Sequence, residues 1–230
     1  MIKKIREYIK RDPVSYIHIE ELLDRDYKIE YASNNGFIIH DNEIDLTYIS
    51  FEDEEEMKEV LKDKKYSTYL TYDKMVCDFY GDTEKTKKLN QYAYLSKEKL
   101  YVGDYDIRVL DESYIDVINK NYKSLDPNED MLEHLKKGEM IAVFENNELA
   151  VFIGQHKEGC MGQLLVFDKY RKKGYAYVLE ASLINKLINE NKRIFNEVLV
   201  ENDVSNHLQA KLGFAKGEKT IYWLVKNYEE

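Results

Sequence analysis

The stretch QLLVFDKYRKKGYA, from Gln163 to Ala176, predicts a strand, a short basic turn and the start of a helix. Gln163 to Phe167 is typical of a buried strand, and an amphipathic run from Tyr175 to Ile188 follows the turn. A helix N-terminus carries about half a positive charge and unpaired backbone N–H groups. Gly174 has no Cβ, so a ligand can approach the backbone closely there. The stretch therefore predicts an anion-binding turn suited to a diphosphate.

The charges of this turn leave an alternative open. Arg171, Lys172 and Lys173 add positive charge to a chain whose balance is strongly acidic. An ordinary strand-to-helix turn with solvated charges has the same composition. A second segment is needed to decide between them.

That second segment is a strand followed by a short helix. Val198 to Glu201 is typical of a buried strand, and Asn202 or Asp203 can cap the helix that follows. Its apolar residues fall on one face, and Gly213 suits the residue after a helix end. Those apolar residues are Val204, Leu208 and Leu212.

The two segments together resemble the GNAT superfamily of N-acyltransferases. The acyl-CoA-binding motif of that family, (Gln or Arg)-x-x-Gly-x-(Gly or Ala), is matched by Arg171-x-x-Gly174-x-Ala176. The later family motif, an Asn after a strand and a helix ending in Leu-Gly-Phe, is matched from Asn202 to Phe214. The resemblance covers roughly residues 104 to 226. The run from Gly154 to Gly162, and Trp223, are similar to the two-lobed glycine N-acyltransferase-like subgroup.

The resemblance implies an α/β (α+β) GNAT fold, with a mixed, mostly antiparallel central sheet flanked by helices. It implies a degenerate GNAT-like lobe at residues 1–100 and an acyl-CoA-binding domain at residues 104–230. The expected helices cover residues 2–11, 16–24, 53–62, 75–80, 112–122, 128–136 and 175–188, and the motif helix after Asn202. The expected strands cover residues 37–40, 44–51, 66–72, 91–95, 106–110, 140–144, 149–155, 159–167, 195–200 and 220–225. The polar stretch 82–100 is expected to be a linker.

The resemblance also implies how acetyl-CoA, or another acyl-CoA, would be held. The strand before the turn would pair with the pantetheine arm through its backbone, and one of its N–H groups would polarise the thioester carbonyl. Asn202 would reach the arm, with helix capping as an equal alternative, and Ser205 lies one turn along. The expected cofactor-binding residues are Leu164, Leu165, Val166, Arg171, Lys172, Lys173, Gly174, Tyr175, Ala176, Asn202 and Ser205.

The acid and base of the reaction are less well marked. Many relatives carry a Glu on the strand before the turn, but residues 161–167 contain no acid. His156 and Glu158, at the preceding turn, are the expected catalytic candidates, with a water chain as the alternative. The position of the usual helix Tyr is Gln209, and Ser205 or Tyr222 are possible substitutes. Cys160 is expected to be a buried thiol rather than a nucleophile, and the histidines form no metal-ligand spacing.

Composition limits the partners. The chain has 230 residues, 43% of them hydrophobic, and a formal net charge of −10. The acidic balance argues against nucleic acid or an anionic membrane as a partner. No apolar stretch is long enough to span a membrane and no signal peptide is evident, so a cytoplasmic protein with reduced Cys77 and Cys160 is expected.

The sequence thus predicts an acyl-CoA-dependent N-acyltransferase that acts on a small-molecule amine without a metal. A catalytically weak acyl-CoA sensor, from a different functional class, is the alternative, because the strand Glu and helix Tyr are missing. A macromolecular amine, such as a protein N-terminus or a charged tRNA, is a weaker third possibility. The acceptor, the acyl-chain length and the oligomeric state are left open.

Overall fold

The computed structural model describes residues 1–123 and 130–224. Its contacts divide the chain into two compact units. The N-terminal unit contains Met1–Ala93, Glu197–His207 and the residues from Ala215 on, and the C-terminal unit contains Tyr94–Asn196 and Leu208–Phe214. The boundary therefore passes through strand β10 (Phe195–Leu199) and helix α8 (Asp203–Leu212). This division differs from the expected consecutive lobes, because the last strand of the chain is part of the sheet of the N-terminal unit.

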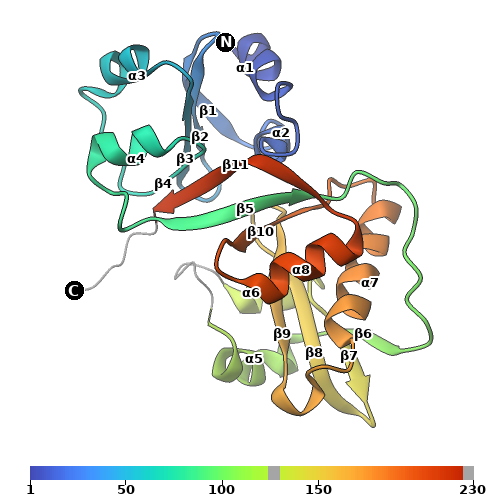
Figure 1. Cartoon of the computed structure of the whole chain (residues 1–230). Coiled ribbons are helices and arrows are strands. Elements are labelled where there is room, and N and C mark those ends of the chain that lie inside the picture. Colours follow the sequence, from blue (N-terminus) through green and yellow to red (C-terminus); the bar gives the residue numbers. More distant parts are fainter. Residues whose placement is uncertain (124–129, 225–230) are drawn as a thin grey trace. The chain divides into compact units, whose positions relative to one another are not determined.

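The N-terminal unit is a sheet covered by helices on both faces (Figure 1). The strands run in the order β1-β2-β3-β4-β11-β5, and β11 lies antiparallel between β4 and β5. Its strands are β1 (Tyr27–Ala32), β2 (Gly36–Asp41), β3 (Leu46–Phe51), β4 (Tyr69–Thr71), β5 (Lys87–Ala93) and β11 (Ala215–Leu224). Its helices are α1 (Ile2–Ile9), α2 (Ile17–Leu22), α3 (Glu54–Leu61) and α4 (Lys74–Tyr80).

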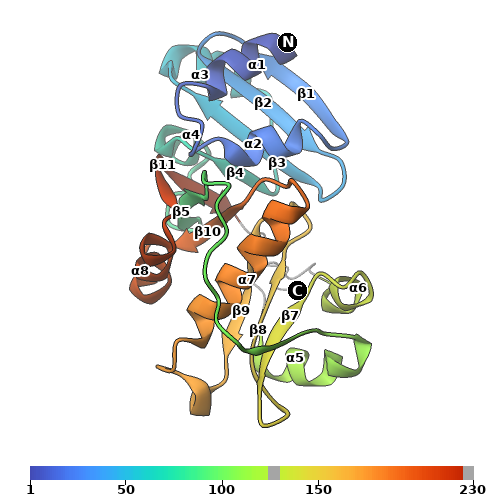
Figure 2. The ribbon, with the colours of Figure 1, turned by 90° about the vertical axis from the view of Figure 1, so that its right-hand side faces the viewer.

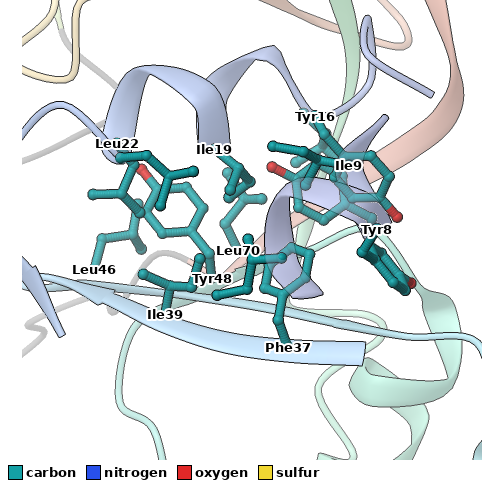
Figure 3. Close-up of a cluster of buried hydrophobic side chains, with 14 of the residues drawn as sticks. Tyr8, Ile9, Tyr16, Ile19, Leu22, Phe37, Ile39, Leu46, Tyr48 and Leu70 are labelled. Carbon is teal, nitrogen blue, oxygen red and sulfur yellow. The ribbon is translucent and has the colours of Figure 1, made fainter. Parts of the chain in front are cut away.

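An aromatic cluster joins α1 and α2 to the sheet (Figure 3). The ring of Phe37 on β2 meets Tyr8 edge-on at 5.3 Å and Tyr16 at 6.0 Å between centroids. Both tyrosine hydroxyls lie 3.0 Å from Ser50 Oγ, so the polar ends of the rings are hydrogen-bonded although buried. A second cluster, including Ile38, Phe51 and Met57, packs α3 and α4 on the opposite face.

A buried acid–histidine pair adds a polar link within the N-terminal unit. His18 Nδ1 lies 2.6 Å from Glu197 Oε1, and His18 Nε2 lies 2.9 Å from the hydroxyl of Tyr48. The side chains of His18 and Glu197 are only 3% and 10% exposed. The pair connects α2 to β10 across 179 positions of sequence, so no local pattern could have predicted it.

The C-terminal unit has the strand order β9-β8-β7-β6, all antiparallel, and β9 is also paired with β10 in parallel at Asn196 and Met161. Helix α7 packs on one face of these strands, and α5 and α6 cover the other (Figure 2). The strands are β6 (Asp106–Val109), β7 (Ile141–Glu145), β8 (Glu148–Gln155) and β9 (Met161–Val166). The helices are α5 (Ile115–Asn121), α6 (Met131–Lys136) and α7 (Tyr175–Asn189), with 3-10 turns at Glu112–Tyr114 and Asp168–Tyr170.

Most expected elements are present, but three predictions were wrong. Strand β1 was not expected, although its Lys28 and Glu30 alternate with apolar residues, as in a strand with one exposed face. The stretch expected to be a linker contains β5, which begins at Lys87, before the strand expected at 91–95, and its Asn90 and Gln91 are buried although polar. Strand β11 begins at Ala215, earlier than expected. Residues 128, 129 and 225 of the expected elements lie outside the described residues.

The expected fold class is confirmed: a large, mostly antiparallel sheet is flanked by helices. Within the described ranges, no helix has both the length and the apolar character needed to cross a lipid bilayer.

Candidate functional site

The candidate site is the turn between β9 and α7, in the C-terminal unit. Two left-handed residues shape it: Lys172 has a φ of 62° and Gly174, the N-cap of α7, has a φ of 86°. Arg171, just before them, is extended, with a φ of −63° and a ψ of 155°. The expected order of a strand, a short turn and a helix that starts at Tyr175 is therefore present.

The N–H groups of this turn are available. In the described part of the chain, no backbone or side-chain group accepts a hydrogen bond from the N–H of residues 172–177. Gly174 has no side chain with which to cap the helix, and a Cβ built on it would meet nothing within 4 Å. The positive end of this 15-residue helix thus has unpaired donors, and the position of a side chain on Gly174 is open.

Two of the three basic side chains of the turn are paired with acids. Arg171 contacts Asp168 at 2.9 Å, and Lys173 Nζ lies 2.9 Å from Glu145 Oε2. All four side chains lie at the surface, where such pairs contribute little free energy. A phosphate group could therefore replace either acid at small cost.

The two aromatic residues of the turn support it from behind. The side chain of Tyr175 is buried and lies edge-on to Tyr170, with 6.1 Å between ring centroids. Its hydrogen bond to the Glu145 carboxylate, together with desolvation, raises the pKa of Tyr175 to about 12. Tyr175 can therefore offer a ligand its backbone N–H, while its ring fixes the start of α7.

Strand β9 carries a bulge beside the turn. Gln163 has a φ of 58°, and the register against β8 shifts between Phe152 and Gly154. On its other side β9 has one register pair with β10, at Met161. Leu164, Leu165 and Val166 follow the bulge and are half-buried. Bulges unpair the ladder and re-aim backbone groups, so these three residues are suited to bind an extended ligand through their main chain.

His156 and Glu158 lie in the turn that joins β8 to β9. The backbone N–H of His156 donates to Cys160 O at 2.8 Å and closes this turn. A Cβ built on Gly162 would lie 2.1 Å from His156 Nε2, so the imidazole rests on the backbone of β9 one residue before the bulge. Glu158 is half-buried. The structure therefore brings His156 close to β9.

Asn202 caps α8. Its Oδ1 accepts a hydrogen bond from the backbone N–H of Ser205 at 3.1 Å. This observation favours the capping alternative for Asn202. Ser205 is half-buried, and both residues belong to the N-terminal unit, whereas the turn at Gly174 belongs to the C-terminal unit.

A buried polar network lies at Gln209, the position where a helix Tyr was sought. Gln209 Nε2 donates to both carboxylate oxygens of Glu180 at 3.2 Å, and Gln209 Oε1 accepts from Asn196 Nδ2 at 2.8 Å. Burial raises the pKa of Glu180 to about 7. Sequence analysis did not identify Glu180, although one acid amid the apolar residues of α7 was a signal.

The other candidates for chemistry are buried or half-buried. Cys160 is 2% exposed, and its Sγ donates to Met161 O at 3.4 Å. Tyr222 is half-buried on β11, where desolvation raises its pKa. Within residues 1–123 and 130–224, no three acidic, histidine or cysteine side chains form a metal-binding group.

Comparison with known proteins agrees with this fold. Residues 140–224 match the model of the FR47-like protein family. A Drosophila protein of known structure superposes with a TM-score of 0.70 at 14% identity, covering 98% of this chain and 95% of that one. An acetyltransferase from the GNAT family from Colwellia psychrerythraea gives 0.57 at 10% identity, covering 96% and 94%. A GCN5-related N-acetyltransferase-like protein from Streptococcus suis gives 0.53 at 13% identity, covering 95% and 99%.

These likenesses establish the GNAT fold, as the sequence predicted. No curated protein matches the chain by sequence. The glycine N-acyltransferase-like subgroup stays a prediction.

Proposed function

We propose that this protein is an N-acyltransferase that moves an acetyl or other short acyl group from acyl-CoA to a primary amine of a small molecule. One observation carries the proposal: the N–H groups of residues 172–177 have no acceptor in the described part of the chain, and the Cβ position of Gly174 at the start of α7 is open. A nucleotide diphosphate is the ligand that such a helix N-terminus suits best. The GNAT fold and the FR47-like match over residues 140–224 agree with it.

In this proposal the turn holds the diphosphate of CoA. The backbone from Lys172 to Ala176 supplies N–H donors, and Arg171, Lys172 and Lys173 supply positive charge. Leu164, Leu165 and Val166 bind the pantetheine arm through the free edge of β9. A backbone N–H beside the bulge polarises the thioester carbonyl. Ser205 stays a predicted contact, and so does Asn202 in addition to its capping role.

The chemistry proposed is direct transfer. An ammonium acceptor first loses a proton to a base, and its nitrogen then attacks the thioester carbonyl carbon. The C–S bond breaks, the nitrogen loses a second proton as the amide forms, and the CoA thiolate takes up one, so one proton is released overall. His156 and Glu158 stay predicted bases, and the placement of the His156 ring on β9 favours His156 of the two.

An acyl-CoA sensor is the second candidate. The observation that favours it is the environment of Gln209, which is 1% exposed and bonded to Glu180 and Asn196. Gln209 cannot donate a proton to a leaving thiolate. Because a thiolate leaves readily near neutral pH, a missing acid would slow transfer without abolishing it.

One experiment separates the two candidates. Purified protein is mixed with acetyl-CoA and a panel of primary amines and amino acids, and free thiol is measured, with CoA binding measured separately by calorimetry. The proposal predicts amine-dependent thiol release. CoA binding without release on any amine would support the sensor instead, and absence of CoA binding would contradict both.

A further inference from the structure

Glu180 is a carboxylate that the proposed chemistry does not use. It lies in the second turn of α7, six residues after Gly174, and is 4% exposed. In the described structure, its hydrogen-bond partner is the Gln209 amide, at 3.2 Å from each oxygen. A buried carboxylate usually has a cation or several N–H donors. Glu180 has one neutral amide shared between its two oxygens.

The groups around Glu180 offer no compensating charge. Helix α8 presents Gln209, and β10 presents Asn196 bonded to that amide. Lys211 on α8 lies over the Tyr177 ring at 5.0 Å. Burial raises the pKa of Glu180 and the hydrogen bond from Gln209 lowers it. Among the described residues, including those of β7, β8 and β9 beneath α7, no charged group shifts this pKa further. The neutral carboxylic acid is therefore accessible near neutral pH.

The network can satisfy either protonation state. With Glu180 ionised, Gln209 donates to it and accepts from Asn196, as in the structure. With Glu180 protonated, its O–H can donate to Gln209 Oε1 once the amide turns over, and the Asn196 amide turns with it. Amide reversal preserves the shape of both side chains, so protonation requires no movement of α7 or α8.

The charge of Glu180 lies on the helix whose N-terminus is the anion-binding turn. Six residues of α-helix span about 9 Å along the axis. At an effective dielectric constant of about 20, a unit charge at that distance from a diphosphate changes its affinity about tenfold after allowance for solvent. A negative charge at Glu180 weakens anion binding, and neutralisation relieves this repulsion.

We propose that Glu180 is a positioning residue: its carboxylate, which is hydrogen-bonded to Gln209 and through it to Asn196, takes up a proton when the turn at Gly174 binds a nucleotide diphosphate. The inference rests on the proposed function, because it requires CoA to bind at this turn. The step is proton uptake alone: the carboxylate gains, on average, a fraction of a proton from solvent as the anion binds. Binding of CoA is therefore tighter below neutral pH than above it.

Calorimetry with CoA tests the inference on the full chain. Heats are measured in two buffers of different ionisation enthalpy near neutral pH, and the Kd is measured from about pH 6 to about pH 8.5. The wild type is expected to take up protons on binding and to lose affinity about tenfold more over this range than Glu180→Gln. CoA's own groups titrate alike with both proteins, so the difference isolates Glu180.

The matched control is Glu190→Gln, at the exposed C-terminal end of the same helix, and it is expected to behave as the wild type. Equal proton uptake and equal pH dependence in the wild type and Glu180→Gln would overturn the inference while leaving CoA binding intact. If Glu180→Gln does not fold, the wild type alone still tests the inference. The inference is overturned if the wild type takes up no more protons on binding than CoA itself accounts for. Absence of CoA binding at every pH would contradict the proposed function instead.

Discussion

At the scale of single residues, Glu180 couples stability to pH. Its folded pKa of about 7 lies above the ordinary value of 4.5, so the folded state binds the proton more tightly than the unfolded state. Its contribution is complete below the unfolded pKa and is lost as pH rises to about 7. A shift of this size corresponds to about 3 kcal/mol.

Glu180→Gln should remove this dependence. The free energy of unfolding of the variant and the wild type is measured in urea between about pH 4 and about pH 8. As pH rises over this range, the variant should gain up to about 3 kcal/mol in stability relative to the wild type. Parallel pH profiles would show that the pKa of Glu180 is the same in the folded and unfolded states, and would contradict this prediction.

Residue patterns explain why some of the site could be predicted from sequence. The turn from Arg171 to Ala176 was found because a local chain conformation and a local charge pattern coincide there. The pairing of Glu180 with Gln209, and of His18 with Glu197, joins residues far apart in sequence, and the local context of each residue does not indicate its partner. Such pairs depend on packing between elements, which hydrophobic periodicity does not specify.

At the scale of elements, Asn202 at the start of α8 has two proposed roles, helix capping and cofactor binding, which a substitution can distinguish. If Asn202 only caps the helix, Asn202→Ala should lower the free energy of unfolding by about 1 kcal/mol and leave CoA affinity unchanged. Asn202→Asp preserves the cap and should be neutral in both measurements. Weaker CoA binding by Asn202→Ala in calorimetry, with unfolding unchanged, would assign Asn202 to the cofactor instead.

The aromatic cluster beneath α1 and α2 makes a second prediction at this scale. Phe37 is fully buried and touches the rings of both Tyr8 and Tyr16 (Figure 3). Phe37→Ala should cost about 3–5 kcal/mol through lost burial and a residual cavity. The comparison is Phe79→Ala, an exposed ring on α4 whose loss should cost much less. Similar unfolding midpoints in urea would contradict the packing described.

Elements also show where sequence patterns fail. The first part of β5, from Lys87 to Asn90, was expected to be linker, with a strand only from Gln91 on, but Asn90 Nδ2 donates to Asn206 Oδ1 at 2.8 Å. A polar residue can occupy a buried strand when a distant partner satisfies it. That partner lies 116 positions away, so composition alone gave the wrong answer.

At the scale of the whole molecule, the chain is not a simple succession of two lobes. Strand β11 fills the place between β4 and β5, and residues 197–207 also belong to the N-terminal unit. A fragment of residues 1–100 would lack both and would leave β4 and β5 unpaired along those edges. It should therefore show no cooperative thermal unfolding by circular dichroism, unlike the full chain, and a sharp transition would contradict this account.

The central claim is that the backbone around Gly174 binds a nucleotide diphosphate. Gly174→Glu fills and charges the space before α7, and Gly81→Glu is its control. Gly81 is also left-handed, with a φ of 68°, and a Cβ built on it also meets nothing within 4 Å. Both substitutions strain the backbone alike, so they should lower the thermal midpoint similarly. Titration of each variant with CoA is the most direct measurement: the account predicts that Gly174→Glu loses CoA binding while Gly81→Glu keeps the wild-type affinity, and wild-type affinity in Gly174→Glu would contradict it.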